Sequence, residues 1–192
     1  DHPCMRRFLT AIGGLLLCAV LPAFAEPTVN EYNGYLEKGP WTAMYRRAEG
    51  TWHAQLSRRV GAFTVAYRRA DLRRTRENRI IAQQSLFRAE GFSLAHRLEY
   101  RAFSGDAIDD HWRYRLIAGY RHRLADNMVA WVRLQPRLAF PGGRRLFDAR
   151  DQVGVEFQLG ALRLSPFYER YAFKSWDRHG GNVFGVHAIL AL

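Results

Sequence analysis

Residues 111–124 alternate between apolar and charged side chains with a period of two, and this pattern constrains the fold more than any other feature. Trp112 and Tyr114 lie at even positions, and Arg113 and Arg115 lie beside them. Successive side chains of an extended strand point to opposite faces, so this segment has one aromatic face and one cationic face. Because the pattern recurs downstream, it predicts strands that separate an apolar medium from water.

An apolar run near the start of the chain predicts export. Arg6 and Arg7 precede the apolar residues 8–21, and residues 23–25 (Ala-Phe-Ala) form a small-x-small cleavage site. This layout is typical of a secretory signal peptide, and the run is too short to span a bilayer as a mature helix. We therefore expect residues 1–4 to lie upstream of the initiator, 5–25 to be the signal peptide, 26–40 a lead-in and 41–192 one barrel domain.

Ten segments of the remaining chain carry a strand pattern, with short turns and longer polar loops between them. The segments are residues 41–49, 51–59, 62–70, 79–88, 92–103, 111–124, 127–140, 151–159, 162–173 and 182–192. Residues 29–36 either add a strand or lead into the first one. From the second segment onward short turns alternate with loops at 71–78, 104–110, 141–150 and 174–181, as in outer-membrane barrels.

The fold class follows from the strands and from the absence of a long apolar stretch after residue 25. No such stretch approaches the ~20 residues of a membrane helix. In lipid, only a closed barrel satisfies the backbone groups of every strand. We therefore predict an all-β protein, a single antiparallel transmembrane β-barrel of about ten strands (8–12), in the outer membrane of a Gram-negative bacterium.

Aromatic spacing supports this prediction. Phe92 and Tyr100 lie eight residues apart on one segment, and Trp112 and Tyr120 lie eight apart on the next. At ~3.3 Å per residue and a tilt of roughly 40°, eight residues rise about 20 Å, close to the ~25 Å between aromatic girdles. The last segment also keeps one apolar face up to its end, as in a barrel-assembly signal.

Three polar side chains fall on the predicted lipid face. They are His96, His122 and Arg170. Pro166 cannot donate to a strand ladder, so a bulge at this proline would turn Arg170 inward.

The opposite face of the strands predicts a cationic lumen. The expected lumen residues are Arg68, Arg97, Glu99, Arg101, Arg113, Arg115, Arg121, Arg133, Gln135, Arg137, Gln152, Glu156, Gln158 and Arg163. Guanidinium groups suit carboxylates, sulfates and phosphates, and a positive field favours the entry of anions. This predicts passage or binding of small anionic solutes, such as acidic sugars. Small barrels are often filled by their own side chains, so a plugged barrel that acts as an envelope scaffold is the alternative.

The net charge of +11 does not indicate a nucleic-acid partner, because the arginines alternate with apolar residues and form no basic block. The expected partners are outer-membrane lipid, lipopolysaccharide, the barrel-assembly machinery and a small anionic solute. Both cysteines precede residue 26, so we expect neither a disulfide nor a thiolate ligand afterwards, and no metal or cofactor.

Two further alternatives come from the loops and from the periodicity itself. Acids and histidines in predicted external loops would suit an outer-leaflet hydrolase: Asp106, Asp109, Asp110, His111, Asp148, Asp151, Asp177 and His179. Loops are rich in such residues for turn formation alone, and no nucleophile elbow or zinc-protease motif is present, so we expect no enzyme. Strand alternation also fits a soluble secreted binding barrel with its apolar face inward.

Several short arginine-rich motifs resemble one family. They are Asn78-Arg79-Ile80 with Gln83-Gln84, residues 96–101 (His-Arg-Leu-Glu-Tyr-Arg), Arg113-Tyr114-Arg115, and residues 147–152 with Tyr168 and His187. Over roughly residues 41–192 the chain is similar to the outer-membrane barrels catalogued as domain of unknown function 2490. This resemblance implies an outer-membrane β-barrel with no settled activity and no catalytic residue. A weaker similarity is to small porins for acidic oligosaccharides.

Overall fold

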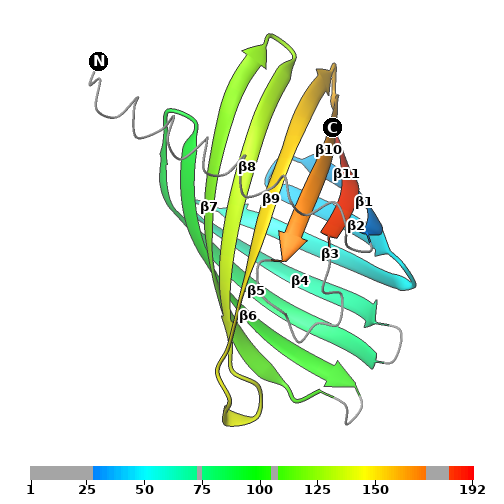
Figure 1. Ribbon diagram of the computed structural model, residues 1–192, viewed down its shortest axis with the longest axis vertical. Helices are drawn as coiled ribbons and strands as arrows, with labels where there is room; N and C mark the ends of the chain where they lie inside the picture. The colour runs from blue at the N-terminus through cyan, green and yellow to red at the C-terminus, as the bar shows by residue number, and fades with distance from the viewer. Residues whose placement is uncertain (1–27, 73–74, 105–107, 172–181) are drawn as a thin grey trace.

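The computed structural model describes residues 28–72, 75–104, 108–171 and 182–192, which form a closed barrel of eleven strands (Figure 1). The strands are β1 (Thr28–Lys38), β2 (Trp41–Ala48), β3 (Thr51–Val60), β4 (Phe63–Leu72), β5 (Thr75–Ala89), β6 (Phe92–Ser104), β7 (His111–Ala125), β8 (Met128–Ala139), β9 (Leu146–Leu159), β10 (Leu162–Tyr171) and β11 (Asn182–Ala191). A short 3-10 turn, η2 (Pro141–Gly143), precedes β9. Among the described residues, no helix is long and apolar enough to cross a membrane.

Each strand pairs antiparallel with its neighbours in sequence, and β1 closes the barrel by pairing parallel to β11. The predicted all-β barrel is therefore confirmed, and its eleven strands lie within the expected range. The ten predicted segments correspond to β2–β11. The additional strand is β1, which covers residues 29–36, where the sequence allowed either a strand or a lead-in. Because the number of strands is odd, the start of β1 and the end of β11 lie at opposite ends of the barrel.

The barrel has two rims that differ in their connections. At one end, which we call the turn rim, two-residue turns at 39–40, 61–62, 90–91, 126–127 and 160–161 join the strands. Gly61 and Gly160 have φ values of 60° and 63° in these turns, a left-handed conformation that glycine adopts without strain. The opposite end, the loop rim, carries the connections 49–50, 73–74, 105–110, 140–145 and 172–181.

Two predicted external loops are shorter than expected. The expected loop at 71–78 is wrong, because β4 continues to Leu72 and β5 begins at Thr75. Similarly, β9 begins at Leu146 and takes in the second half of the expected loop 141–150. The polar residues in these stretches keep the strand alternation, with Glu77 buried between two exposed neighbours. Strands therefore continue beyond the apolar part of the wall. The expected loop at 174–181 lies outside the described residues.

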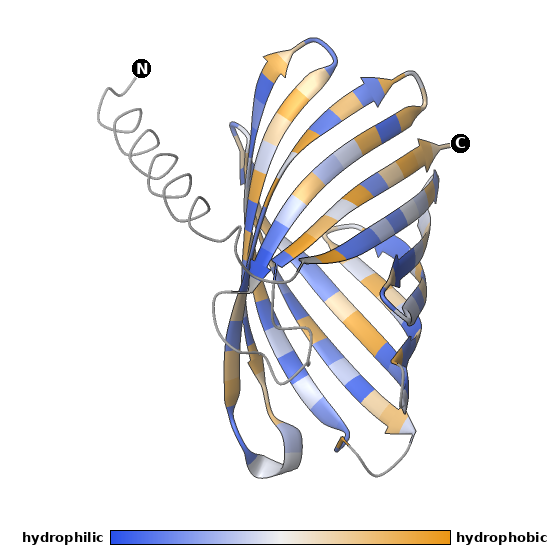
Figure 2. Ribbon diagram, turned by 45° about the vertical axis from the view of Figure 1, so that its right-hand side comes forward, coloured by the Kyte–Doolittle hydropathy of each residue, from blue (hydrophilic) through white to orange (hydrophobic). Residues whose placement is uncertain are grey.

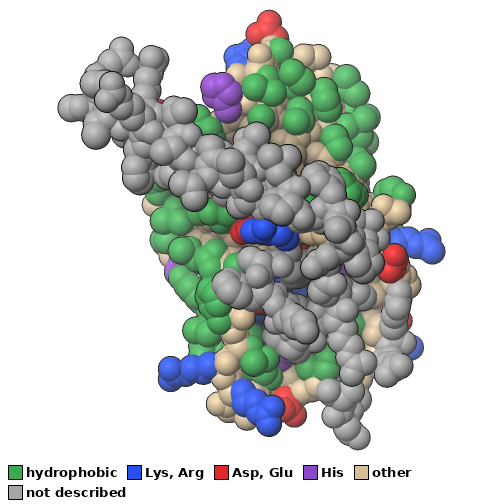
Figure 3. All heavy atoms as spheres, viewed as in Figure 1, with side chains coloured by type: hydrophobic (Ala, Val, Ile, Leu, Met, Phe, Trp, Pro, Cys, Tyr) green, Lys and Arg blue, Asp and Glu red, His purple; other side chains and the backbone are tan. Residues whose placement is uncertain are grey.

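Apolar side chains cover the outside of the barrel and charged side chains face its interior. Trp112 is 51% exposed and Leu98 is 45% exposed, whereas Arg113 and Arg115 are buried. Hydropathy alternates along the strands in Figure 2, and hydrophobic side chains dominate the described wall between the rims in Figure 3. The alternative arrangement, in which the apolar faces of the strands point into the barrel, is therefore wrong.

The aromatic residues chosen for their spacing form two cross-strand pairs on the outer wall. Phe92 packs on Tyr120 near the turn rim with ring centroids 4.5 Å apart. Tyr100 packs on Trp112 near the loop rim at 5.1 Å. The two pairs mark the upper and lower limits of an apolar band on β6 and β7.

The polar residues expected on the outer wall remain there. β10 pairs with β11 through Pro166 without a register shift, so the expected bulge is absent and Arg170 stays outside. Arg170 forms an ion pair with Asp151 of β9 at 3.3 Å, which supplies a partner without any change of face. The His96 ring hydrogen-bonds Gln84 across β5 and β6 at 2.9 Å.

One side of the interior is packed with aromatic residues. Trp131, Phe167 and Val183 form a buried cluster on β8, β10 and β11, and the indole N–H of Trp131 donates to the Ser165 hydroxyl at 2.8 Å. Gly185 makes room for this cluster, because a Cβ at that position would lie 2.4 Å from the Phe167 ring. The cluster fills space along part of the wall and leaves the arginine-rich side open.

Candidate functional site

The interior of the barrel contains a cavity of about 1960 Å³, lined by residues from all eleven strands. It extends from Arg163 and Ile189 near the turn rim to Thr75 and Gly142 at the loop rim. Cavities of this size exceed those of typical small-molecule sites.

The structure places ten of the eleven charged residues predicted for the lumen at this cavity. They are Arg68, Arg97, Arg101, Arg113, Arg115, Arg121, Arg133, Arg137, Glu156 and Arg163. The eleventh, Glu99, is fully buried and bonded to arginines of the same wall. Gln135 and Gln152 also line the cavity. Gln158 is different: it is exposed next to the turn rim, where its amide donates to the carbonyl of Gly160.

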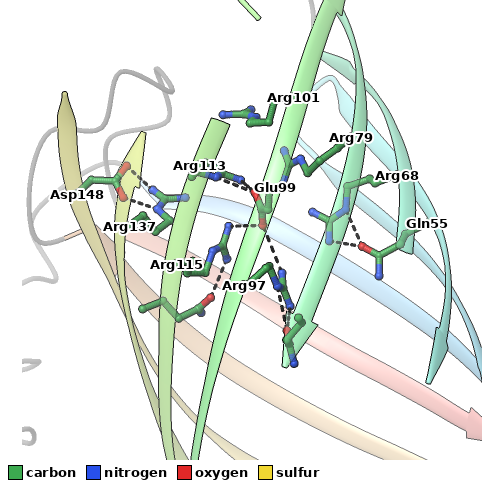
Figure 4. Close-up of polar contacts among 12 residues, drawn as sticks. Gln55, Arg68, Arg79, Arg97, Glu99, Arg101, Arg113, Arg115, Arg137 and Asp148 are labelled. Carbon is green, nitrogen blue, oxygen red and sulfur yellow. Dashed lines mark hydrogen bonds and ion pairs between the residues drawn. The ribbon is translucent and has the colours of Figure 1, made fainter. Parts of the chain in front are cut away.

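Glu99 of β6 is the centre of a network of arginines (Figure 4). Its Oε2 accepts hydrogen bonds from Nε and Nη2 of Arg113 at 2.8 and 2.5 Å. Arg115 lies 3.3 Å from Oε1, Arg79 lies 3.4 Å from Oε2, and Arg97 lies 3.6 Å from Oε1. One carboxylate therefore serves four guanidinium groups, and it cannot neutralise them all.

Two further carboxylates hold arginines on the same wall. Arg101 makes a two-pronged contact with Glu77, with Nε and Nη2 at 2.8 and 2.9 Å from the two carboxylate oxygens. Arg79 donates to Glu77 as well, at 2.6 Å. Asp148 of β9 forms a similar two-pronged pair with Arg137. Such forks are the strongest hydrogen bonds available to arginine, and they hold these side chains against the wall.

A chain of amides connects the arginine network to β10. Arg115 donates to Gln135 at 2.8 Å, Gln135 donates to Gln152 at 2.9 Å, and Gln152 donates to Glu169 at 2.5 Å. Arg150 forms an ion pair with the other oxygen of Glu169 at 2.6 Å.

Three lumen arginines have neutral partners. Nε and Nη2 of Arg68 both donate to the Oε1 of Gln55, at 2.9 and 2.6 Å. Arg97 contacts Oε1 of Gln83 in the same way, at 2.9 and 2.6 Å. The guanidinium carbon of Arg133 lies 5.4 Å from the centre of the Trp131 ring. None of these partners carries charge, although Arg97 also lies 3.6 Å from the Glu99 carboxylate.

The contacts described above follow the wall of the barrel. Most of them join residues of the same strand or of two neighbouring strands. The most distant partners, such as Arg121 on β7 and Glu156 on β9, have one strand between them. These contacts therefore run along the wall, and none of them crosses the cavity to the opposite side.

Some residues of the site were missed by the sequence analysis. These are Glu31, Tyr35, Arg46, Gln55, Glu77, Arg79, Gln83, Arg150 and His187, all of which line the cavity. Most of them lie an even number of positions from a residue on the same strand that was predicted to face inward. The alternation of side chains therefore predicts that they face inward as well. Glu31 and Tyr35 belong to β1, which was not assigned as a strand.

The residues considered for a hydrolase are dispersed. Asp148 faces inward in its pair with Arg137, and Asp151 lies outside with Arg170. The Asp110 carboxylate accepts from the Phe103 N–H at 2.7 Å, and the ring of His111 contacts the backbone carbonyl of Asp109 at 2.7 Å. Asp106, Asp177 and His179 lie outside the described residues. Within the described part of the chain, no group of three or more His, Cys, Asp or Glu side chains could hold a metal ion.

Comparison with known proteins adds no assignment: no family model matches the chain, and no curated protein is significantly similar to it.

Proposed function

We propose that this protein is an outer-membrane barrel of a Gram-negative bacterium whose lumen passes or binds small anionic solutes. The apolar outer wall and its two aromatic pairs support insertion in a bilayer, because water would not favour so much exposed apolar surface. The resemblance to the barrels catalogued as domain of unknown function 2490 agrees with this location. Recovery in the outer-membrane fraction, with heat-modifiable migration, tests it.

The observation that carries the functional proposal is the excess of arginine around an open cavity. Its arginines are Arg46, Arg59, Arg68, Arg79, Arg88, Arg97, Arg101, Arg113, Arg115, Arg121, Arg133, Arg137, Arg144, Arg150 and Arg163, whereas its acids are Glu31, Glu37, Glu77, Asp109, Glu156 and Glu169. Even with Glu99 and Asp148 added, guanidinium groups outnumber carboxylates. A hydrated lumen of this charge attracts anions and repels cations.

Reversal potentials in planar bilayers test passage directly. With a chloride salt gradient across refolded protein, we expect the sign of the potential to show selectivity for anions. Arg59→Glu and Arg144→Glu change the charge of the cavity near the turn rim and the loop rim, respectively, and should each reduce this selectivity. Arg69→Glu is the matched control, because Arg69 is exposed on the outer wall and does not line the cavity.

The alternative function is a closed scaffold, which the buried cluster of Trp131, Phe167 and Val183 inside the barrel favours. A scaffold would give no conductance at any voltage. Cation selectivity of the wild type would refute an anion pathway. Arg113 and Arg115 are unsuitable targets for this test, because their replacement would leave Glu99 buried without its main partners.

A further inference from the structure

Three lumen arginines with neutral hydrogen-bond or stacking partners line the same cavity as the Tyr35 hydroxyl. Arg68, Arg97 and Arg133 belong to β4, β6 and β8, which alternate around the barrel. Tyr35 of β1 lines the same cavity. The strand register places Tyr35 opposite Met44 and Met44 opposite Gln55, so Tyr35 lies in line with the partner of Arg68. The four side chains therefore belong to one lining of the cavity.

The two glutamines orient their arginines without cancelling the charge. Gln55 and Gln83 each offer a single amide oxygen to both Nε and Nη2 of the facing arginine. Glu99 and Glu77 hold Arg113 and Arg101 through the same two nitrogens, but with a carboxylate. The amide contact leaves the positive charge of Arg68 at the lumen surface and that of Arg97 only partly balanced by Glu99, which three other arginines share, whereas the carboxylate contact removes most of the charge.

The remaining donors of Arg68 and Arg97 make no strong hydrogen bond. The Nη1 atom of Arg68 has no hydrogen-bond partner among the described residues. The Nη1 atom of Arg97 lies 3.6 Å from Glu99, too far for a strong hydrogen bond. Arg133 is exposed within the lumen and stacks on Trp131, which supplies no counter-charge. Like charges that share a cavity repel one another unless water or an anion lies between them.

We propose that Arg68, Arg97, Arg133 and the Tyr35 hydroxyl form a binding site for a doubly charged oxyanion of the phosphate or sulfate type. Three fixed positive charges match a dianion better than a monoanion. Three guanidinium groups and a phenol also offer more donors than the two oxygens of a carboxylate can accept. The oxyanion can be a free ion or an ester group of a larger solute. The inference rests on the proposed function because the ion must reach the site through the lumen.

Isothermal titration of the detergent-refolded full chain with inorganic phosphate tests the site. Gln55→Glu and Gln83→Glu keep the size and contact geometry of each glutamine but cancel the charge of its arginine. We expect each to weaken phosphate binding by ~10-fold or more, and the double variant to abolish measurable binding. Gln158→Glu adds the same charge outside the cavity and should leave affinity unchanged. Glycerol 3-phosphate in place of phosphate shows whether an ester also fits.

Acetate provides the test of ligand class, and we expect it to bind ~10-fold or more weakly than phosphate. Equal affinity for acetate, or unchanged phosphate binding in the double variant, would overturn the proposal. If the double variant does not fold, Arg133→Gln serves instead, because its side chain is exposed in the lumen and bonded to no carboxylate described. The same loss of affinity is expected.

The two proposals fail in different ways. Anion-selective conductance without phosphate binding by the wild type would refute the site and leave the proposed pathway standing. Phosphate binding without conductance would support the site and refute passage.

Discussion

Replacement of Glu99 by glutamine should destabilise the barrel strongly. Glu99 is 0% exposed and has four guanidinium groups within 3.6 Å, and it receives two short hydrogen bonds from Arg113. Glutamine fills the same space but removes the negative charge that Arg113 and Arg115 contact, and it turns donor hydrogens toward these arginines. Loss of one partner from a buried ion pair costs about 3–5 kcal/mol, which is a large part of the stability of a typical domain. We expect a loss in the free energy of unfolding of this size.

Urea unfolding of the refolded protein, followed by tryptophan fluorescence and by heat-modifiable migration, measures this loss. Glu90→Gln is the matched control, because Glu90 is exposed in a two-residue turn and its replacement should change stability by less than ~0.5 kcal/mol. If Glu99→Gln were no more destabilising than Glu90→Gln, the guanidinium groups would not depend on this carboxylate. The described network would then be wrong.

Two further predictions concern the interior packing and the outer wall. Gly185→Ala should destabilise the barrel by about 1–3 kcal/mol, because the new Cβ would lie 2.4 Å from the Phe167 ring. Gly34→Ala is the control and should not destabilise the barrel, because a Cβ at Gly34 would meet no atom within 4 Å. Equal urea midpoints for the two variants would contradict this packing. Leu98→Arg places a charge on the apolar band and should cost about 2–4 kcal/mol in vesicles, against about 0–1 kcal/mol for Leu159→Arg beside the turn rim. Similar costs at both positions would argue against a lipid-facing band.

Most of the fold could be predicted because strand alternation is a local property of the sequence. Each of β2–β11 has an outward face rich in apolar or aromatic residues, and this pattern identifies the segments without knowledge of their partners. β1 was harder to assign because Asn30 and Gly34 interrupt its outward face with residues of low β-propensity. Hydrogen bonds to both β2 and β11 hold this strand in place, and the sequence does not show them.

The lumen residues could be predicted from the alternation of inward and outward positions along each strand, but their partners could not. Whether an arginine faces a glutamate or a glutamine depends on the register between strands, as Arg68 opposite Gln55 and Arg97 opposite Gln83 show. Register is fixed by turn positions and by bulges, such as the shift between Ser85 and Phe87, which alternation does not show. The distinction between cancelled and uncancelled charges therefore required the structure.

The relative positions of two tryptophans test the central claim most directly. Trp112 is 51% exposed on the outer wall, whereas Trp131 is 6% exposed and faces the interior. In variants that keep one of these and carry phenylalanine at every other tryptophan, lipids with brominated chains should quench Trp112 strongly and Trp131 weakly. Stronger quenching of Trp131, or equal quenching of both, would mean that the apolar face does not contact lipid.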